Sequence, residues 1–580
     1  MTVPQRRKSD LFPPVPAALP EGDDEDRLLH AVEGAATFGL SPVVLSLAAL
    51  DWAVHLANAP YRRLHLARLW VEQWRRLMAA AAGEPAITPS PGDHRFSAPA
   101  WRQFPYDLLH QAFLLTDEWW GRATTRVRGT TPVNERIVAF SARQWLDMMS
   151  PSNIPWLNPE VIEATRTSGG RNLVQGFCNF LADLGAGEGS RAAARFAVGR
   201  DLAVTPGKVV LRNDLMELIQ YAPATSSVHA EPLLIVPAWI MKYYILDLSP
   251  ENSLVRYLVR QGFTVFCISW RNPGADQSDV TFDDYRRLGI IAALDVIETI
   301  TGTAKTHVLG YCLGGTLSVI AAAALARDRQ DRLASLTLLA TQTDFTEAGG
   351  LQIFITESQV TFLEDIMWAR GTLASTQMAG AFQLLRSNDL VWSRAVRNYL
   401  LGVQDQPNDL MAWNADATRM PYRMHAEYLR RLFLDNDLAE GHFPVDGRPV
   451  SVDDIAVPMF IVGTETDHVA PWHSVYKLHL LNKGDITFVL TSGGHNAGIV
   501  SEPGHPNRHY AIKRRPVRET YIGPDEWLTE ARQRDGSWWP AWSEWLAERA
   551  GPKVEPPPMG GGRKGSKPLA DAPGTYVFEK

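Results

Sequence analysis

One hexapeptide has the spacing of a nucleophile on a sharp turn between a strand and a helix. It is Gly310-Tyr311-Cys312-Leu313-Gly314-Gly315, which places Cys312 where the pattern G-x-S-x-G has serine. An apolar run at residues 306–309 precedes it, and a helical pattern begins at Gly315. The chain folds back on itself at such a turn, so small residues are needed two positions on either side of the nucleophile. The pattern predicts an exposed thiol beside a helix start and favours it over a buried structural cysteine.

A nucleophile at such a turn needs a base and an acid, in the chain order nucleophile, acid, base. Asp467 follows an apolar run at residues 459–463, and His495 follows a run at 486–490 and a Gly-Gly pair. The carboxyl ends of parallel strands meet at one edge of a sheet, so both side chains are expected there beside the thiol. We therefore predict Cys312 as nucleophile, Asp467 as acid and His495 as general base.

Other residues could fill the acid and base positions. Asp344 follows another apolar run, at residues 336–339, where enzymes of this kind can also place the acid. Four more histidines could be the base, although none of them follows both a strand and a Gly-Gly turn; they are His468, His473, His505 and His509. His468 lies next to Asp467, so a supporting role or a role in positioning the substrate fits it better.

Two backbone N–H groups should stabilise the oxyanion that forms during acyl transfer. Leu313 directly follows the nucleophile, and geometry predicts its N–H as the first donor. The second donor is expected in the loop after the apolar run at residues 233–236, near Ala238 or Trp239.

Cysteine as the nucleophile favours acyl transfer over hydrolysis. A histidine that takes the proton of a thiol leaves a thiolate, which is the nucleophilic form. Transfer of an acyl group from a thioester to cysteine gives another thioester, so little free energy is lost. The acyl group can therefore still be passed to an alcohol.

Six short apolar runs bounded by turn residues, most of them separated by helical patterns, predict a parallel sheet covered on both faces. They lie at residues 233–236, 264–268, 307–309, 336–339, 459–462 and 486–490. With the turn at Cys312, they predict the α/β-hydrolase fold. More than a hundred residues, rich in aromatic residues and Met, separate the fourth run from the fifth. We interpret residues of about 345–437 as a cap over the carboxyl edge that controls access, in preference to a second independent domain.

The rest of the chain divides into helical and low-complexity parts. We predict a variable helical region at residues 1–94, a Trp-rich helical N-terminal domain at 95–205 and a catalytic domain with its cap at 206–550. Residues 551–580 contain Pro-Pro-Pro and Gly-Gly-Gly, which predict a flexible C-terminal tail.

Composition limits the class of protein. A chain of 580 residues, 45% of them hydrophobic, can bury a large core. A net charge of −7 with 21% charged residues gives no sign of a nucleic-acid partner. The three cysteines are too few and too scattered for a disulfide framework or a zinc site, and they suit a reducing cytoplasm; they are Cys178, Cys267 and Cys312.

No membrane span is expected. The first residues lack the apolar core of a signal peptide. The most apolar stretch, residues 41–60, carries Asp51, His55 and Asn58, and Ser41-Pro42 resembles a helix start. We therefore expect a soluble or interfacial helix there.

A series of further motifs accompanies the nucleophile turn. In chain order they occupy residues 142–151, 232–237, 242–248, 269–273, 388–392, 413–418, 467–472, 536–540 and 572–577. Together they resemble the polyhydroxyalkanoate synthases, most closely the single-subunit class I poly(3-hydroxybutyrate) polymerases. One stretch departs from that family. Residues 237–241 are Pro-Ala-Trp-Ile-Met where the family usually has Pro-Pro-x-Ile-Asn, so the substrate range and the second oxyanion donor stay open.

The resemblance implies Cys312 as nucleophile, His495 as base and Asp467 as acid. It also implies an (R)-3-hydroxyacyl-CoA substrate, with 3-hydroxybutyryl-CoA expected, a polyester product and no cofactor or metal. A homodimer is a further expectation. The alternatives are a thioesterase or polyester depolymerase that uses the same residues on water, and a non-catalytic granule-binding protein.

An insoluble product implies movement from the cytoplasm to the surface of polyester granules. Apolar protein surface should help to hold the enzyme there, and two segments are candidates. They are the helix at residues 41–60, which could equally form a homodimer contact, and the Trp-rich segment 538–545, for which core packing is the favoured interpretation.

Overall fold

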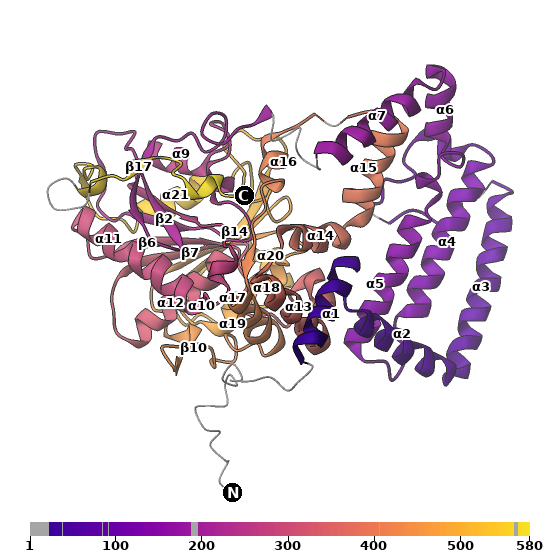
Figure 1. Cartoon of the computed structure of the whole chain (residues 1–580), viewed down its shortest axis with the longest axis horizontal. Coiled ribbons are helices and arrows are strands. Elements are labelled where there is room, and N and C mark those ends of the chain that lie inside the picture. The colour runs from indigo at the N-terminus through magenta and orange to yellow at the C-terminus, as the bar shows by residue number, and fades with distance from the viewer. Residues whose placement is uncertain are drawn as a thin grey trace, which may run out of the picture.

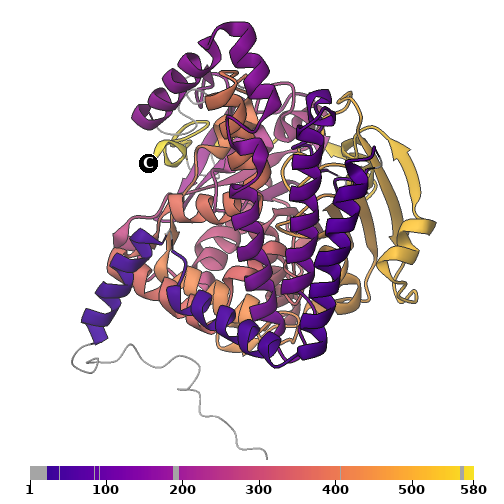
Figure 2. The same cartoon turned by 90° about the vertical axis from the view of Figure 1, so that its right-hand side faces the viewer.

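A large mixed sheet and a group of long N-terminal helices lie on opposite sides of the molecule (Figure 1). The computed structural model describes residues 23–37, 39–83, 85–90, 92–186, 195–404, 406–561 and 567–580. Seen at right angles, the N-terminal helices stand in front of the sheet, with shorter helices between the two (Figure 2).

The sheet has eleven strands in the order β15-β14-β13-β12-β7-β6-β4-β5-β2-β1-β17. Its centre is parallel and consists of β4 (Leu233–Val236), β5 (Val265–Trp270), β6 (Thr306–Tyr311), β7 (Leu333–Leu339), β12 (Met459–Thr464) and β13 (Ile486–Thr491). All six predicted apolar runs are therefore strands, and the α/β-hydrolase fold is confirmed.

Both faces of the parallel strands are buried, as their continuous apolar runs predict. In β4, Leu234 and Val236 pack in one hydrophobic core, and Leu233 and Ile235 pack in a second core on the other face. The first core is covered by α11 (Ala292–Thr301) and α12 (Leu313–Arg327), and the second by α9 (Leu254–Arg260) and α21 (Trp539–Ala547). Trp538, Trp542 and Trp545 are buried in the second core, which confirms core packing for that segment.

The edge strands were not predicted. All of them pair antiparallel, and they are β1 (Gly207–Arg212), β2 (Met216–Tyr221) and β17 (Ala570–Asp571) at one edge and β14 (His509–Arg515) and β15 (Arg532–Asp535) at the other. Charged residues interrupt each of these sequences, so they lack the continuous apolar run that marks the central strands.

The α-helices of the described residues that precede the sheet are α1 (Asp23–Ala36), α2 (Pro42–Ala57), α3 (Pro60–Ala80), α4 (Tyr106–Thr124), α5 (Pro132–Met148), α6 (Pro159–Ser168) and α7 (Arg171–Ala186). Local sequence sets several of their ends. Thr131 and Asn158 accept hydrogen bonds from the first turns of α5 and α6, each of which begins with proline. The glycine after α6, Gly169, has a left-handed φ of +61°.

The chain between β7 and β12 is mostly helical. Its longer elements are α13 (Glu357–Arg370), α14 (Ser375–Leu385), α16 (Asp409–Asn414), α17 (Tyr422–Glu427) and the π-helical turns η7 (Asn388–Trp392), η8 (Val396–Leu400) and η9 (Tyr428–Leu434). Helices α13 and α14 lie between the sheet and the N-terminal helices (Figure 1).

Helix α1 packs along α13. Gly34 makes the approach possible, because a Cβ there would lie 2.3 Å from the side chain of Ile366. His30 Nδ1 lies 2.7 Å from Asp365 Oδ2, and the Arg27 guanidinium lies 5.2 Å from the centre of the Trp368 ring.

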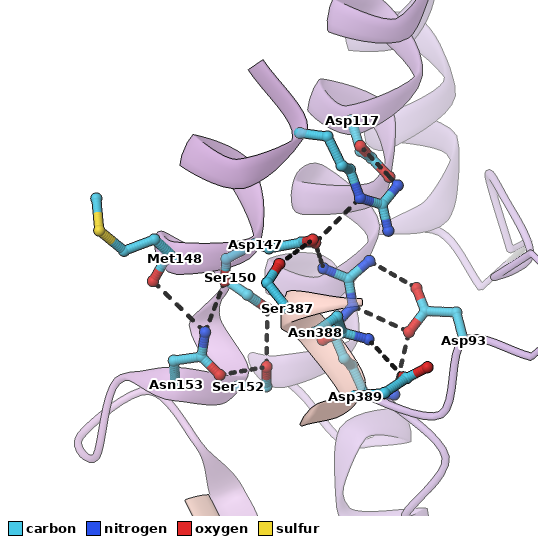
Figure 3. A network of polar contacts seen from close by, with 12 residues as sticks. Asp93, Asp117, Asp147, Met148, Ser150, Ser152, Asn153, Ser387, Asn388 and Asp389 are labelled. Carbon is cyan, nitrogen blue, oxygen red and sulfur yellow. Dashed lines mark hydrogen bonds and ion pairs between the residues drawn. The ribbon is translucent and has the colours of Figure 1, made fainter. Parts of the chain in front are cut away.

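A buried ionic network joins the segment before α4, helix α5 and the η7 region (Figure 3). The Arg95 side chain, only 2% exposed, donates to Asp93 Oδ2 at 2.7 Å and to Asp147 Oδ1 at 3.0 Å. Asp147 also accepts from Arg143 Nε at 3.1 Å and from Ser387 Oγ at 3.4 Å.

Arg95→Met should therefore destabilise the fold, because it leaves two carboxylates in the interior without their shared cation. The expected loss is about 3–5 kcal/mol in the free energy of unfolding. Urea denaturation measures it. The solvent-exposed pair of Arg166 and Glu163 is the control, since Arg166→Met should leave the midpoint unchanged. Equal midpoints for the two variants would contradict a structural role for the network.

The described chain end, residues 567–580, is packed and does not form the expected flexible tail. Strand β17 pairs with β1, and the buried Lys242 donates from Nζ to the carbonyls of Tyr576 at 3.1 Å and Glu579 at 2.7 Å. Buried Glu217 accepts from the N–H groups of Thr575 and Tyr576. Residues 567–580 are packed because buried ionic groups of the sheet domain need partners, and this segment supplies them.

Candidate active site

Cys312 lies between strand β6 and helix α12 in a strained backbone conformation. Its φ is +54° and its ψ is −123°, and its N–H donates to Leu339 O at 2.9 Å on the neighbouring strand. A residue with a side chain rarely adopts a positive φ, and such strain is often found where a functional group must be held in one direction. The thiol is partly exposed at the carboxyl edge of the sheet.

The glycines around Cys312 are required by close packing. A Cβ on Gly310 would lie 2.4 Å from Gly315 Cα, and a Cβ on Gly314 would lie 2.2 Å from Val236 O. A Cβ on Gly315 would lie 1.8 Å from Thr341 Oγ1. The need for small residues that the sequence predicts thus arises from strand–helix contact on three sides.

Asp467 and His495 meet beyond the carboxyl ends of β12 and β13. His495 Nδ1 lies 2.7 Å from Asp467 Oδ2. Asp467 Oδ1 accepts from the N–H groups of Val469 and Ala470, both at 2.8 Å, and Thr464 Oγ1 donates to Oδ2 at 3.1 Å. The carboxylate is thus held in one orientation with the histidine on its open side.

The electrostatics couple His495 to both of its neighbours. Burial opposes a charge on the imidazole, yet Asp467, then Cys312, raise the pKa of His495 well above its usual value. Burial likewise opposes a charge on Asp467, but His495 and the backbone N–H groups hold the pKa of Asp467 below its usual value. The arrangement favours an imidazolium between a carboxylate and a sulfur atom.

The alternative acid and bases have other partners. Asp344 accepts from Thr346 N–H at 2.9 Å and lies 3.7 Å from Lys477 Nζ. The imidazoles of three of the other candidate bases contact Asp525, the carbonyl of Pro506 and Glu465; they belong to His473, His505 and His509, respectively. Burial lowers the pKa of His468, the residue next to Asp467. Of the two candidate acids, Asp467 is the one whose carboxylate contacts His495.

The predicted oxyanion donors differ in how well they are placed. Leu313 is the first residue of α12, where backbone N–H groups have no partner within the helix. The Trp239 side chain is buried away from solvent and stacks on Tyr285, with ring centres 4.3 Å apart. Its bulk therefore fills the core, and only its backbone can serve the site.

The sequence interpretation missed a contact that supports the histidine loop. Tyr311 Oη donates to Asn496 Oδ1 at 2.5 Å, and the Tyr311 and His495 ring centres are 5.6 Å apart. The sequence offered one signal for this contact. Tyr311 precedes the predicted nucleophile, Asn496 follows the predicted base, and both have side chains that can form hydrogen bonds.

In the described parts of the chain, no group of three or more His, Cys, Asp or Glu residues could hold a metal ion.

Comparisons with known families cover most of the chain. Residues 23–62 match the family model described as "Poly-beta-hydroxybutyrate polymerase N terminal". Residues 92–258 match "Poly-beta-hydroxybutyrate polymerase (PhaC) N-terminus", and residues 231–502 match "alpha/beta hydrolase fold".

Curated relatives extend the match. A poly(3-hydroxyalkanoate) polymerase of Methylorubrum extorquens is 42% identical over 521 residues, which are 89% of this chain and 85% of the relative. The chain belongs to the poly(3-hydroxyalkanoate) polymerase family. A polymerase subunit of Cupriavidus necator is 40% identical over 87% of this chain and 86% of its own length. One of Rhizobium meliloti is 38% identical over 88% of this chain and 84% of its own length.

Family membership confirms the resemblance predicted from the motifs. The α/β-hydrolase match contains Cys312, Asp467 and His495, and the two polymerase matches cover most of the N-terminal helices. This member of the poly(3-hydroxyalkanoate) polymerase family thus combines a hydrolase-type sheet with an N-terminal helical part.

Proposed function

We propose that this chain is an acyltransferase that polymerises (R)-3-hydroxyacyl-CoA, with 3-hydroxybutyryl-CoA as the expected monomer, into a polyester. The observation that carries the proposal is the placement of His495 against Asp467 beside a strained cysteine, in a chain of this family. Its electrostatic coupling to Cys312 supports the same assignment.

In the proposed acylation step, His495 takes the proton of Cys312 and the thiolate attacks the thioester carbonyl. The Leu313 N–H donates to the oxyanion that forms. When the intermediate collapses, the carbon–sulfur bond to CoA breaks and the CoA sulfur receives the proton from His495.

In the proposed elongation step, the 3-hydroxyl of a second acyl group attacks the acyl group on cysteine. His495 removes the hydroxyl proton, and that proton then returns to the cysteine sulfur as it leaves. Each step breaks one thioester bond, and elongation forms one oxygen ester. Asp467 stabilises the imidazolium in both steps.

A product assay separates this function from hydrolysis. Purified protein is incubated with 3-hydroxybutyryl-CoA while CoA release is followed and the acyl product is recovered. Insoluble polymer is expected. Free 3-hydroxybutyrate released in equal amount to CoA would instead identify the thioesterase alternative, and no CoA release would favour a non-catalytic granule protein.

Asp467→Asn should reduce polymer formation more than the first acylation. A Cys–His pair can ionise without its third member, whereas repeated deprotonation of a hydroxyl depends on a strongly basic histidine. Rapid-quench measurement of the first CoA released, set against steady-state polymerisation, tests this. Asp344→Asn is the matched control and should behave as wild type. A larger defect in Asp344→Asn would move the acid to Asp344.

We also propose that the enzyme attaches to the surface of its own product, in part through α2. Four apolar side chains recur on one exposed face of this helix; they are Val43, Leu47, Leu50 and Val54. Among the described residues no single helix is long and apolar enough to cross a bilayer, although α2 and α3 pass that test as a pair bent by 91°. A homodimer contact through the same helices is the competing use of this surface.

Tagged protein should be diffuse in cells without monomer and ring-like around granules when monomer is supplied. Leu47→Lys with Leu50→Lys should shift part of the fluorescence back to the cytosol, because two charges interrupt the apolar face. Leu480→Lys, at an exposed leucine in α19 (Leu478–Leu481), is the control. Diffuse wild-type signal in granule-filled cells would contradict attachment, and a change in oligomeric state alone would assign the face to a dimer.

A further inference from the structure

A small apolar cavity lies between α13, α14, η9 and the chain at residues 39–40. Its volume is about 90 Å³, and aliphatic and aromatic side chains form most of its wall. Leu363 from α13 and Met378 and Ala381 from α14 contribute to that wall. A hollow lined mainly by apolar side chains favours apolar groups.

One end of this cavity, which we call the cap cavity, lies toward the nucleophile. Ile240 lines it and directly follows Trp239, in the loop whose Pro237 carbonyl packs against Gly314 of the cysteine turn. Tyr428 also lines it, and burial, then the neighbouring Cys312, raise the pKa of Tyr428. The cavity wall therefore reaches the loop and the tyrosine that border the nucleophile.

The cap cavity also contains an unused polar group. His425 lines it and is 2% exposed, and its Nδ1 finds no hydrogen-bond partner in the described ranges of the chain. Burial lowers the pKa of His425 to about 4, so the imidazole is neutral at physiological pH. A neutral, buried and unpartnered ring nitrogen is costly unless a ligand completes its hydrogen bonding.

The N-terminal part of the chain forms one wall of the cap cavity. The buried Gln359 of α13 donates from Nε2 to Gly39 O at 2.6 Å and accepts from Ser41 N–H at 2.9 Å. Helix α2 begins after Ser41, as predicted, but the serine side chain makes no capping bond. The backbone N–H of Ser41 instead bonds to Gln359. Gly39 and Leu40 are thereby held as part of the cavity wall.

We propose that the cap cavity binds the aliphatic side chain on C3 of the acyl group carried by Cys312, with His425 contacting the oxygen on the same carbon. This inference rests on the proposed acyl-transfer function. A cavity of 150 Å³ can take the six carbons of benzene, so the cap cavity has room for about three or four carbons. It therefore sets the longest side chain that the enzyme accepts.

Filling the cavity tests the proposal. Ala381→Leu adds bulk inside it, and the kcat/KM for 3-hydroxyhexanoyl-CoA should fall about 10-fold or more relative to that for 3-hydroxybutyryl-CoA. Gly380→Leu is the matched control on the same helix, because a Cβ added at Gly380 would meet no atom within 4 Å, and the ratio should not change. Met378→Ala enlarges the cavity and should move the ratio in favour of the longer acyl group.

The ratio compares two substrates on the same folded enzyme, so a loss of stability does not imitate the result. Unchanged ratios in both Ala381→Leu and Met378→Ala would overturn the proposal. Gln359→Leu removes both bonds that hold this wall in place and should weaken discrimination between the two acyl lengths.

A second measurement does not depend on polymerisation. Alkylation of Cys312 by N-alkyl iodoacetamides of increasing chain length is followed in a Cys178→Ser background. A rate preference for short alkyl chains that is stronger in Ala381→Leu than in the parent protein supports the cap cavity even when no polymer is formed. The same preference in both proteins would refute the cavity while leaving the proposed function intact.

Discussion

Cys312→Ala should abolish CoA release from 3-hydroxybutyryl-CoA while leaving the fold unchanged. Loss of a covalent nucleophile removes the acyl-enzyme route entirely, and a fall of about 10⁴-fold or more in kcat is expected. Alanine carries the same Cβ as cysteine, so the strain at a φ of +54° is the same in both proteins. Steady-state CoA release and thermal unfolding are the two measurements.

Three further variants sharpen the Cys312 test. Cys312→Ser should retain little activity, because the histidine environment suits a thiol. Cys312→Gly should be equally inactive but at least as stable as Cys312→Ala, since glycine adopts a positive φ without strain. Cys178→Ala changes an exposed cysteine and should be fully active. Wild-type turnover by Cys312→Ala would rule out the assigned nucleophile.

His495→Gln should remove the base and lower kcat/KM by about 10³-fold or more. Glutamine can still donate a hydrogen bond to Asp467, so the buried carboxylate keeps a partner and the fold survives. The variant therefore separates proton transfer from structure. His509→Gln is the control, because His509 is exposed and bonded to Glu465 and should not affect turnover.

The pH dependence of alkylation adds a direct readout of His495. Its pKa is raised in the folded protein, so its interaction with Asp467 is fully present below the ordinary pKa near 6.5. That interaction is lost only as the pH rises through the raised pKa of His495. In a Cys178→Ser background, iodoacetamide should alkylate Cys312 quickly at neutral pH. Adding His495→Gln should slow this alkylation about ten-fold or more. Equal rates at neutral pH would show that His495 does not activate the thiol.

The central strands and the cysteine turn could be predicted because their signals are local. A strand buried on both faces needs a continuous apolar run, and residues 233–236 and 486–490 show it without reference to the rest of the chain. The turn shows its glycines on both sides of Cys312 within six residues, although Gly314 and Gly315 are needed for contacts with Val236 and Thr341 elsewhere in the fold. Chain order then sufficed to predict Asp467 and His495 as candidate partners.

The choice between two acids required the sheet order. Asp344 and Asp467 both follow parallel strands, so their sequences alone leave both possible. Strand β13, which precedes His495, pairs with β12 and not with β7, and this brings Asp467 within 2.7 Å of the imidazole. Pairing between strands far apart in sequence decides that distance.

Contacts between segments far apart in the sequence could be identified only from the three-dimensional structure. Gln359 holds residues 39–41 across 318 and 320 positions of sequence, and Lys242 holds the chain end across more than 300. Each is a single polar side chain whose distant partner the local sequence does not indicate. The parallel strands and the cysteine turn could be predicted from the sequence alone, because their signals depend on neighbours along the chain. The contact of Asp467 with His495, the cap cavity and the packed chain end depend on the tertiary structure, because buried polar groups take whichever partner the fold brings to them.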